Sequence, residues 1–187
     1  MLSIMQKVLG FSNEEIALAS KNNQLLSMEI ELASRCNLRC VYCYAGKNLF
    51  REDELEQEEI IDAISQAKAL GARKIIYVGA GEPLLDVNLR DIVHYVHKIG
   101  MEHVLFTNAT LMNAEIARFL FENEVVPIVK YPSMKEELFN RLAGCDGAHA
   151  SMMRGLGYLR KAGYPDKQHQ LGIEAIVTTY TIKEIPT

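Results

Sequence analysis

The sequence predicts an α/β fold in which parallel strands form a partial TIM-like (β/α) barrel. Two observations predict it. Strand-like and helix-like segments alternate along the chain in five units, and polar motifs follow directly after several of the strand-like segments. Such alternation implies right-handed crossovers and a parallel sheet. Polar residues at the carboxyl ends of the strands match the face on which barrels of this kind carry their sites.

The period of the apolar residues justifies each element. In residues 27–34, Met28, Ile30 and Leu32 alternate with two glutamates, which is the periodicity of a strand. The later strands are expected at residues 74–78, 103–107, 127–131 and 171–178. The helices are expected at residues 54–70, 88–99, 113–123, 133–143 and 149–162. Asn113 and a capping box of Ser133 with Glu136 indicate two of the helix starts.

The first 25 residues differ from this pattern, and we expect them to form a separate N-terminal helical segment before a core domain at residues 26–187. A short helix is expected at residues 2–9, and a second at residues 12–21 begins with a capping box of Ser12 and Glu15. These helices are expected to cover the bottom or an edge of the barrel.

The composition restricts the class of protein. A chain of 187 residues suits one domain, and its 49% of hydrophobic residues supplies a sizeable core. The net charge of -4 gives no reason to expect a nucleic acid or an acidic membrane as partner. No apolar run approaches the length of a membrane span, and no signal peptide is visible. We therefore expect a cytoplasmic protein.

Three cysteines form the most informative motif. Cys36, Cys40 and Cys43 have the spacing C-x3-C-x2-C. A tight loop with this spacing can turn three sulfurs toward one centre, as in a [4Fe–4S] cluster that keeps one iron open for another molecule. A zinc site is an alternative, but a structural zinc ion takes four protein ligands, and Cys145, a possible fourth, lies far along the chain. A disulfide is less favoured because three clustered cysteines cannot all pair.

A second motif follows the strand expected at residues 74–78. Its residues are Gly79, Ala80, Gly81, Glu82 and Pro83. Small residues let backbone carbonyls approach a ligand closely. With the carboxylate of Glu82 they can accept the three hydrogens of an ammonium group. A simple tight turn between strand and helix is the alternative for this motif taken alone.

Together the two motifs resemble those of the radical S-adenosylmethionine (radical SAM) superfamily. The resemblance includes the aromatic Tyr42 before the third cysteine and a GGEP-like motif in which Ala80 replaces the usual second glycine. It extends from about residue 26 to residue 187. The later part is similar to the branch that contains molybdenum-cofactor biosynthesis and peptide-maturing enzymes. Because members usually have six strand–helix units, the five counted here predict a truncated barrel that is open beside the fifth strand.

The resemblance implies the chemistry. The three cysteines would hold three irons of a [4Fe–4S] cluster, and the amino and carboxylate groups of SAM would chelate the fourth. Reductive cleavage of SAM would give a 5′-deoxyadenosyl radical that takes a hydrogen atom from the substrate. The resemblance also implies an electron donor such as flavodoxin or ferredoxin and a small-molecule or peptide substrate. No catalytic residue of the protein itself can be assigned from the sequence.

The resemblance further implies which residues contact SAM. Tyr42 is expected near the adenine, and the ammonium is expected at Gly79, Ala80, Gly81 and Glu82. Contacts to the SAM carboxylate or ribose are expected from Thr107, Asn108 and Ser133. Alternatively, Asn108 shapes a turn and Ser133 only caps a helix. Three further polar residues are expected to point into the barrel and to pair with one another or with a ligand, namely Glu31, Lys130 and Glu174.

Two other functions fit the same residues. One is a catalytically silent radical-SAM-like subunit or fragment that binds a partner. The other is a zinc-stabilised binding module that uses the same cysteines. Iron content, zinc content and SAM turnover separate the three.

Overall fold

A computed structural model describes residues 8, 10–45 and 54–184. Its five strands form one sheet in the order β1-β2-β3-β4-β5, and every neighbouring pair is parallel. The strands are β1 (Ser27–Glu31), β2 (Lys74–Val78), β3 (Glu102–Thr107), β4 (Val126–Lys130) and β5 (Gly172–Glu174). The parallel sheet that the sequence predicts is confirmed.

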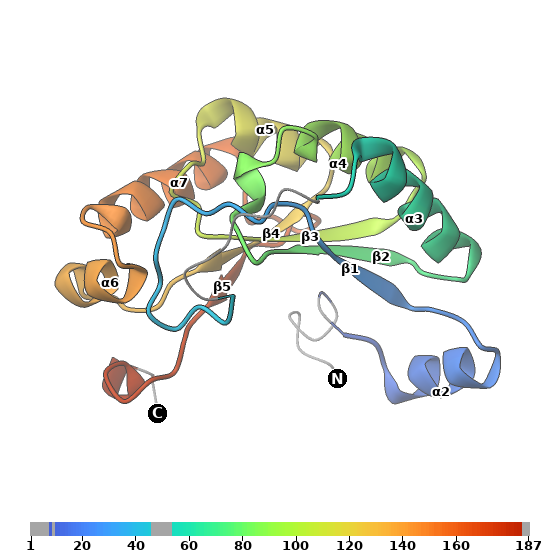
Figure 1. Cartoon of the computed structure of the whole chain (residues 1–187), viewed down its shortest axis with the longest axis horizontal. Helices are drawn as coiled ribbons and strands as arrows, with labels where there is room; N and C mark the ends of the chain where they lie inside the picture. Colours follow the sequence, from blue (N-terminus) through green and yellow to red (C-terminus); the bar gives the residue numbers. More distant parts are fainter. Residues whose placement is uncertain (1–7, 9, 46–53, 185–187) are drawn as a thin grey trace.

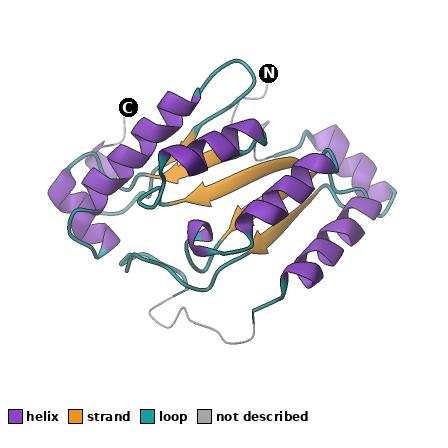
Figure 2. Ribbon diagram, turned by 90° about the horizontal axis from the view of Figure 1, so that it is seen from above, coloured by secondary structure: helices purple, strands orange, loops and turns teal. Residues whose placement is uncertain are grey.

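Helices that follow the strands lie over one face of the sheet (Figure 1, Figure 2). They are α3 (Gln57–Ala69), α4 (Leu89–Lys98), α5 (Ala114–Glu122), α6 (Glu136–Ala143) and α7 (Ala148–Ala162). The helix α2 (Asn13–Lys21) precedes β1 and lies apart from them (Figure 1). Two short 3-10 helices are η1 (Pro83–Leu85) and η2 (Ile182–Glu184). In the part of the chain that the structure describes, no helix has the length and apolar character needed to cross a membrane.

The main hydrophobic core lies between the sheet and these helices. On the sheet side it includes Ile75, Tyr77 and Leu105, whose side chains are fully buried. Because successive residues of a strand point to opposite faces, Ile76 and Val104 turn to the other face. There they form a smaller cluster with Ile128. The sheet is therefore apolar on both faces, and polar side chains collect at the ends of its strands.

Local signals set most helix ends as expected. Ser12 and Glu15 form the predicted capping box of α2. The Asn113 side chain accepts a hydrogen bond from the Ile116 N–H at 2.8 Å and caps α5. Gly163 ends α7 with a φ of 125°, and a Cβ there would lie 2.6 Å from the Phe121 ring. Only a glycine fits this position without displacing that ring.

Two boundary predictions need correction, and a third lies almost wholly outside the described residues. The capping box of Ser133 with Glu136 was wrong, because Lys135 is the N-cap residue of α6 and makes no side-chain cap bond. The first strand ends at Glu31, three residues before the predicted end, since the backbone beyond it leaves the sheet for the cysteine loop. Of the helix predicted at residues 2–9, only residue 8 lies within the described residues.

The fifth strand is also shorter than the predicted residues 171–178. β5 contains three residues and pairs with β4 alone in the described part of the chain. Beyond it the backbone turns back on itself, because Thr181 Oγ1 donates to the Ile176 carbonyl at 2.7 Å and accepts from the Thr178 N–H at 2.8 Å. These side-chain bonds replace the backbone pairing that a longer strand would need.

A buried histidine makes the stability of the fold depend on pH. His103 is 2% exposed, its Nε2–H donates to the Asn123 carbonyl at 2.6 Å, and Nδ1 accepts from the Tyr77 hydroxyl at 3.4 Å. Burial lowers the pKa of His103 from 6.5 to about 4. The unfolded chain therefore takes up this proton at a higher pH than the folded chain does. The contribution of His103 to the free energy of unfolding is fully present above the pKa of the unfolded chain. It is lost as the pH falls through the pKa of the folded chain.

We expect this histidine to remove about 2 kcal/mol from the free energy of unfolding between about pH 7 and about pH 5. In His103→Asn that part of the pH dependence should disappear, although the variant will be less stable at both values. Urea unfolding at the two pH values measures the difference. An unchanged pH dependence in the variant would show that the histidine is not the source.

Candidate functional site

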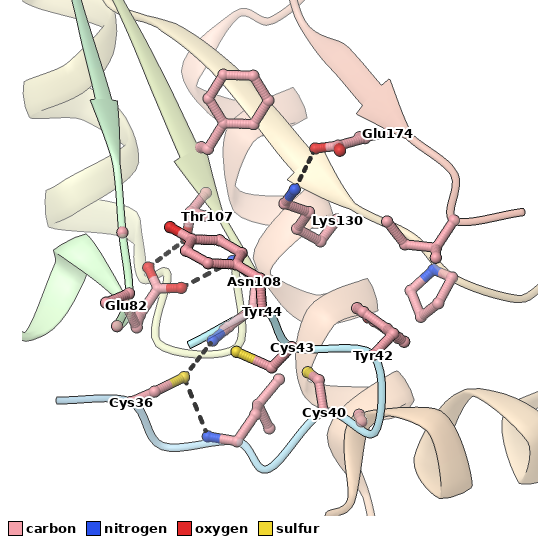
Figure 3. A pocket seen from close by; sticks show the side chains of 18 of the residues that line it. Cys36, Cys40, Tyr42, Cys43, Tyr44, Glu82, Thr107, Asn108, Lys130 and Glu174 are labelled. Atoms are coloured by element: carbon pink, nitrogen blue, oxygen red, sulfur yellow. Dashed lines mark hydrogen bonds and ion pairs between the residues drawn. The ribbon is translucent and has the colours of Figure 1, made fainter. Parts of the chain in front are cut away.

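The carboxyl ends of the strands surround a cavity of about 330 Å³ (Figure 3). It is lined by residues at or just after the ends of β2, β3, β4 and β5 and by the loop that follows β1. Those that carry the argument are Cys36, Cys40, Tyr42, Cys43, Tyr44, Gly79, Ala80, Gly81, Glu82, Phe106, Thr107, Asn108, Lys130 and Glu174. The structure thus brings the three cysteines and the glycine motif to one place, as expected for the site face of a partial barrel.

The cysteine loop is fixed against the end of α6. The Arg39 N–H donates to the Ala143 carbonyl and the Val41 N–H donates to the Leu142 carbonyl, both at 2.9 Å. Gly144 makes this approach possible, because a Cβ on it would lie 2.3 Å from the Arg39 carbonyl oxygen. The guanidinium of Arg39 also donates to the Cys36 and Leu38 carbonyls at 2.8 Å. The backbone between the first two cysteines is therefore held from both sides.

The thiols lie in a partly buried setting. Cys36 Sγ accepts a hydrogen bond from the Leu38 N–H at 3.4 Å. Burial raises the pKa of the Cys36 and Cys40 thiols, so their thiolates need a positive partner. Within residues 8, 10–45 and 54–184, no three cysteine, histidine or acidic side chains stand close enough together to hold a single metal ion. Sulfurs that ligate three different irons of a cluster lie farther apart than sulfurs on one ion.

The glycine motif packs directly against the start of the cysteine loop. A Cβ on Gly81 would lie 2.1 Å from the Arg35 carbonyl oxygen and 2.4 Å from that of Ala33. The Glu82 N–H donates to the same Arg35 carbonyl at 2.8 Å. Ala80 lies between the two glycines and lines the cavity. The two sequence motifs therefore meet backbone to backbone, which explains why Gly81 admits no side chain.

Glu82 is the most enclosed charged group of the site, with 2% exposure. Its carboxylate accepts from the Thr107 hydroxyl at 2.5 Å, from the Asn108 N–H at 2.8 Å and from the Leu84 N–H at 3.2 Å. Burial raises its pKa, and the bonds from Thr107, Asn108 and Leu84 oppose that rise. The site thus places a carboxyl group, held by three donors, at the wall of the cavity.

Asn108 connects β3 to the cysteine loop. Its Nδ2 donates to Asn37 Oδ1 at 3.0 Å, and its Oδ1 accepts from the Thr110 N–H at 2.9 Å. Asn37 Nδ2 in turn donates to Thr110 Oγ1 at 2.7 Å. Asn108 both shapes the turn after β3 and contributes to the cavity wall. The roles of Asn37 and Thr110 were not predicted, because Asn37 fills a variable position of the cysteine motif and Thr110 lies outside both motifs.

Each of the three polar residues expected to point into the barrel has a side-chain partner. Lys130 Nζ lies 2.5 Å from Glu174 Oε2, so these two do pair as predicted. Glu31 instead accepts from the Tyr44 hydroxyl at 2.7 Å. Partial burial and this bond raise the pKa of Tyr44 to about 12. Tyr44 was not predicted as a site residue, although it directly follows Cys43 in the loop that lines the cavity.

Ser133 is the one expected SAM contact that does not line the cavity. It is buried, and its hydroxyl donates to the Glu184 carboxylate at 2.9 Å and accepts from the Lys135 N–H at 3.0 Å. This bonding ties η2 to the segment after β4. A contact of Ser133 with SAM stays a prediction. Tyr42 lines the cavity, and burial raises its pKa.

Comparison with known proteins decides the family. Residues 30–184 match the model of the radical SAM superfamily. The chain belongs to the radical SAM superfamily. Its cysteine loop, its Gly-Ala-Gly-Glu-Pro motif and its parallel sheet are therefore the superfamily's features as this sequence builds them.

Two curated relatives illustrate the range of activities in the superfamily. The Fe-coproporphyrin III synthase of Methanosarcina barkeri (strain Fusaro / DSM 804) is 30% identical over 156 residues, which are 83% of this chain and 38% of the relative. The GTP 3′,8-cyclase of Limosilactobacillus fermentum (strain NBRC 3956 / LMG 18251) is 40% identical over 99 residues, 51% of this chain and 30% of the relative. The chain thus spans less than half the length of these relatives.

Among solved structures, SuiB of Streptococcus suis bound to the precursor peptide SuiA superposes with a TM-score of 0.72 at 19% identity. The match covers 89% of this chain and 37% of SuiB. It confirms the partial TIM-like barrel. The GTP 3′,8-cyclase among the relatives agrees with the resemblance to the branch that contains molybdenum-cofactor biosynthesis enzymes, and SuiB shows the shared fold.

Proposed function

We propose that this chain carries the SAM-cleaving site of a radical SAM enzyme, with a [4Fe–4S] cluster on Cys36, Cys40 and Cys43. The observation that carries the proposal is that these thiols and the buried Glu82 line one cavity at the carboxyl ends of the strands. Residues 26–187 form the core domain in this proposal, and residues 1–25 form an N-terminal segment.

Cys36, Cys40 and Cys43 fit such a cluster. Their thiols come from one loop, which backbone hydrogen bonds hold against α6. When bound and reduced, the cluster supplies the electron for SAM cleavage, and the 5′-deoxyadenosyl radical so formed takes a hydrogen atom from the substrate. The protein's part is to bind, orient and exclude water. The N–H group of Leu38, which donates to Cys36 Sγ, is placed to stabilise a sulfur ligand.

SAM would occupy the cavity beside the thiols. Glu82 offers the carboxylate for the ammonium group, and Thr107 and Asn108 hold that carboxylate in place. Gly79, Ala80 and Gly81 provide backbone at the cavity wall, and Tyr42 offers a ring for the adenine. Thr107 therefore acts through Glu82, which is a more specific role than the direct SAM contact expected from the sequence.

The class of substrate, the electron donor and the compartment are also proposals. Relatives and neighbours act on GTP or bind a peptide, as their names state. A small molecule or a peptide is therefore the proposed substrate, and flavodoxin or ferredoxin is the proposed electron donor. We propose the cytoplasm as the compartment, because a reducing environment keeps the three thiols free for iron.

Anaerobic reconstitution with iron and sulfide tests this function. We expect about four irons per chain, a broad brown absorbance, and conversion of SAM to 5′-deoxyadenosine and methionine when dithionite supplies electrons. A colourless protein with one zinc ion per chain would instead establish the binding module. An iron-loaded protein that never cleaves SAM would establish the silent subunit.

A matched pair of substitutions tests the role of Glu82. Glu82→Ala should weaken SAM binding roughly ten- to a hundredfold, because one charge-assisted hydrogen bond contributes about 1.5–3 kcal/mol. Iron content should be unchanged. Glu174→Ala serves as the control, since this glutamate also lines the cavity but lies apart from Glu82 (Figure 3). Calorimetry on reconstituted protein gives both affinities, and equal SAM affinity in Glu82→Ala and wild type would reject the role.

A further inference from the structure

One ion pair on the cavity wall has no part in the proposed SAM site. Lys130 ends β4, Glu174 ends β5, and the two are register partners in the sheet. Figure 3 shows them across the cavity from the sulfurs of Cys36 and Cys40. Their side chains are 35% and 33% exposed, and both line the cavity. Each therefore keeps polar surface that a ligand in the cavity can reach.

The pair has hydrogen-bonding capacity left after its own contact. An ammonium group has three N–H donors, and a carboxylate has about four acceptor positions. Lys130 Nζ forms an ion pair with Glu174 Oε2 at 2.5 Å and lies 5.2 Å from the centre of the Phe106 ring. Because Oε2 is buried, the second carboxylate oxygen of Glu174 is the acceptor left for a ligand, beside the N–H donors of Lys130.

The charges around the pair oppose an anionic ligand. Among the described residues that line the cavity, Lys130 is the only basic one, and Glu82 and Glu174 are the acidic ones. A carboxylate or phosphate that approached Lys130 would also approach Glu174, whose negative charge repels it. The neighbouring wall of Phe106, Pro132 and Ile176 is apolar and does not solvate a net charge.

We propose that the Lys130–Glu174 pair determines substrate specificity by binding a neutral amide group of the substrate. An amide offers a carbonyl acceptor to Lys130 and an N–H donor to Glu174, and it brings no charge into the apolar wall. The same pair disfavours carboxylates and phosphates at this place, which is how a balanced charge pair gives specificity. This inference rests on the proposed function, since it takes the cavity as the place where SAM and substrate meet.

The pair also joins the edge strand β5 to β4, so loss of either residue can weaken the fold. Three variants separate the two roles. Glu174→Gln leaves the charge of Lys130 without its partner, and Lys130→Gln does the reverse for Glu174. The double variant Lys130→Glu with Glu174→Lys restores a balanced pair in the opposite order. A structural role predicts weaker folding in the single variants and no change in which probe is preferred.

The experiment uses two probes that differ only at one end, N-acetyl-4-fluorophenylalanine amide and its free carboxylate. Fluorine NMR titrations follow their binding to the reconstituted full chain, first without SAM and then with SAM added. The wild type should prefer the amide by about tenfold. Glu174→Gln should reverse the preference, Lys130→Gln should weaken binding of both probes, and the double variant should again prefer the amide.

Several results would overturn the inference. The first is a wild type that prefers the carboxylate or binds neither probe. The second is a ratio of amide to carboxylate affinity that is the same in all variants. The third is displacement of the amide by added SAM. The last would show that the pair belongs to the SAM site. Failure of the proposed function is seen separately, as absence of 5′-deoxyadenosine in the same reconstituted preparation, so the two failures are distinguishable.

Discussion

Serine at position 36, 40 or 43 should abolish cluster binding. Iron content should fall from about four per chain to less than about one, and SAM cleavage should become undetectable, because a cluster held by two thiolates loses an anchor that no neighbour replaces. The thiols of Cys36, Cys40 and Cys43 line one cavity, whereas Cys145 is exposed and does not line it. Cys145→Ser should therefore keep its iron.

Iron analysis and absorbance after anaerobic reconstitution check this prediction, with circular dichroism as the control for folding. Serine is nearly the size of cysteine, and the loop is held by backbone bonds to α6 that the substitution leaves intact. Loss of iron in Cys145→Ser equal to that in Cys40→Ser would contradict it. Retention of iron in any of the three other single variants would show that the cluster uses a ligand outside the triplet.

Sequence alone predicted those features that follow from local patterns. The strands and helices carry clear apolar periods, and their order required a parallel sheet, which the structure has. The cysteine triplet and the Gly-Ala-Gly-Glu-Pro motif are contiguous in sequence. Their meeting at one cavity followed because the carboxyl ends of parallel strands lie at one edge of the sheet.

The rest depended on contacts between residues far apart in the chain. Ser133 has the sequence context of a helix cap, yet the Glu184 carboxylate, 51 residues on, binds its hydroxyl. The bond from the Thr107 hydroxyl to Glu82 was not predicted either, since the two residues are 25 positions apart. The early end of β5 depends on Thr181, whose side chain bonds the Ile176 carbonyl. No local pattern indicates such partners, because each residue type has several possible bonds and only the fold selects one.

The contact between the two motifs predicts a second large effect, at Gly81. A methyl group there would lie 2.1 Å from one backbone carbonyl oxygen and 2.4 Å from another, those of Arg35 and Ala33. Backbone cannot move aside as a flexible side chain can, so the glycine motif must separate from the cysteine loop. We expect Gly81→Ala to lower the free energy of unfolding by about 3 kcal/mol, the upper part of the usual range for overpacking.

Separation of the two motifs should also break the bond from the Glu82 N–H to the Arg35 carbonyl. Gly81→Ala should then lose SAM affinity even at temperatures where it stays folded. Gly157→Ala is the matched control, because Gly157 lies in α7 and a Cβ there meets nothing within 4 Å. The same change from glycine to alanine should stabilise that helix by about 0.5–1 kcal/mol. Urea unfolding and SAM titration of both variants measure the contrast, and equal stability of the two would show that the motifs do not pack as closely as the structure has them.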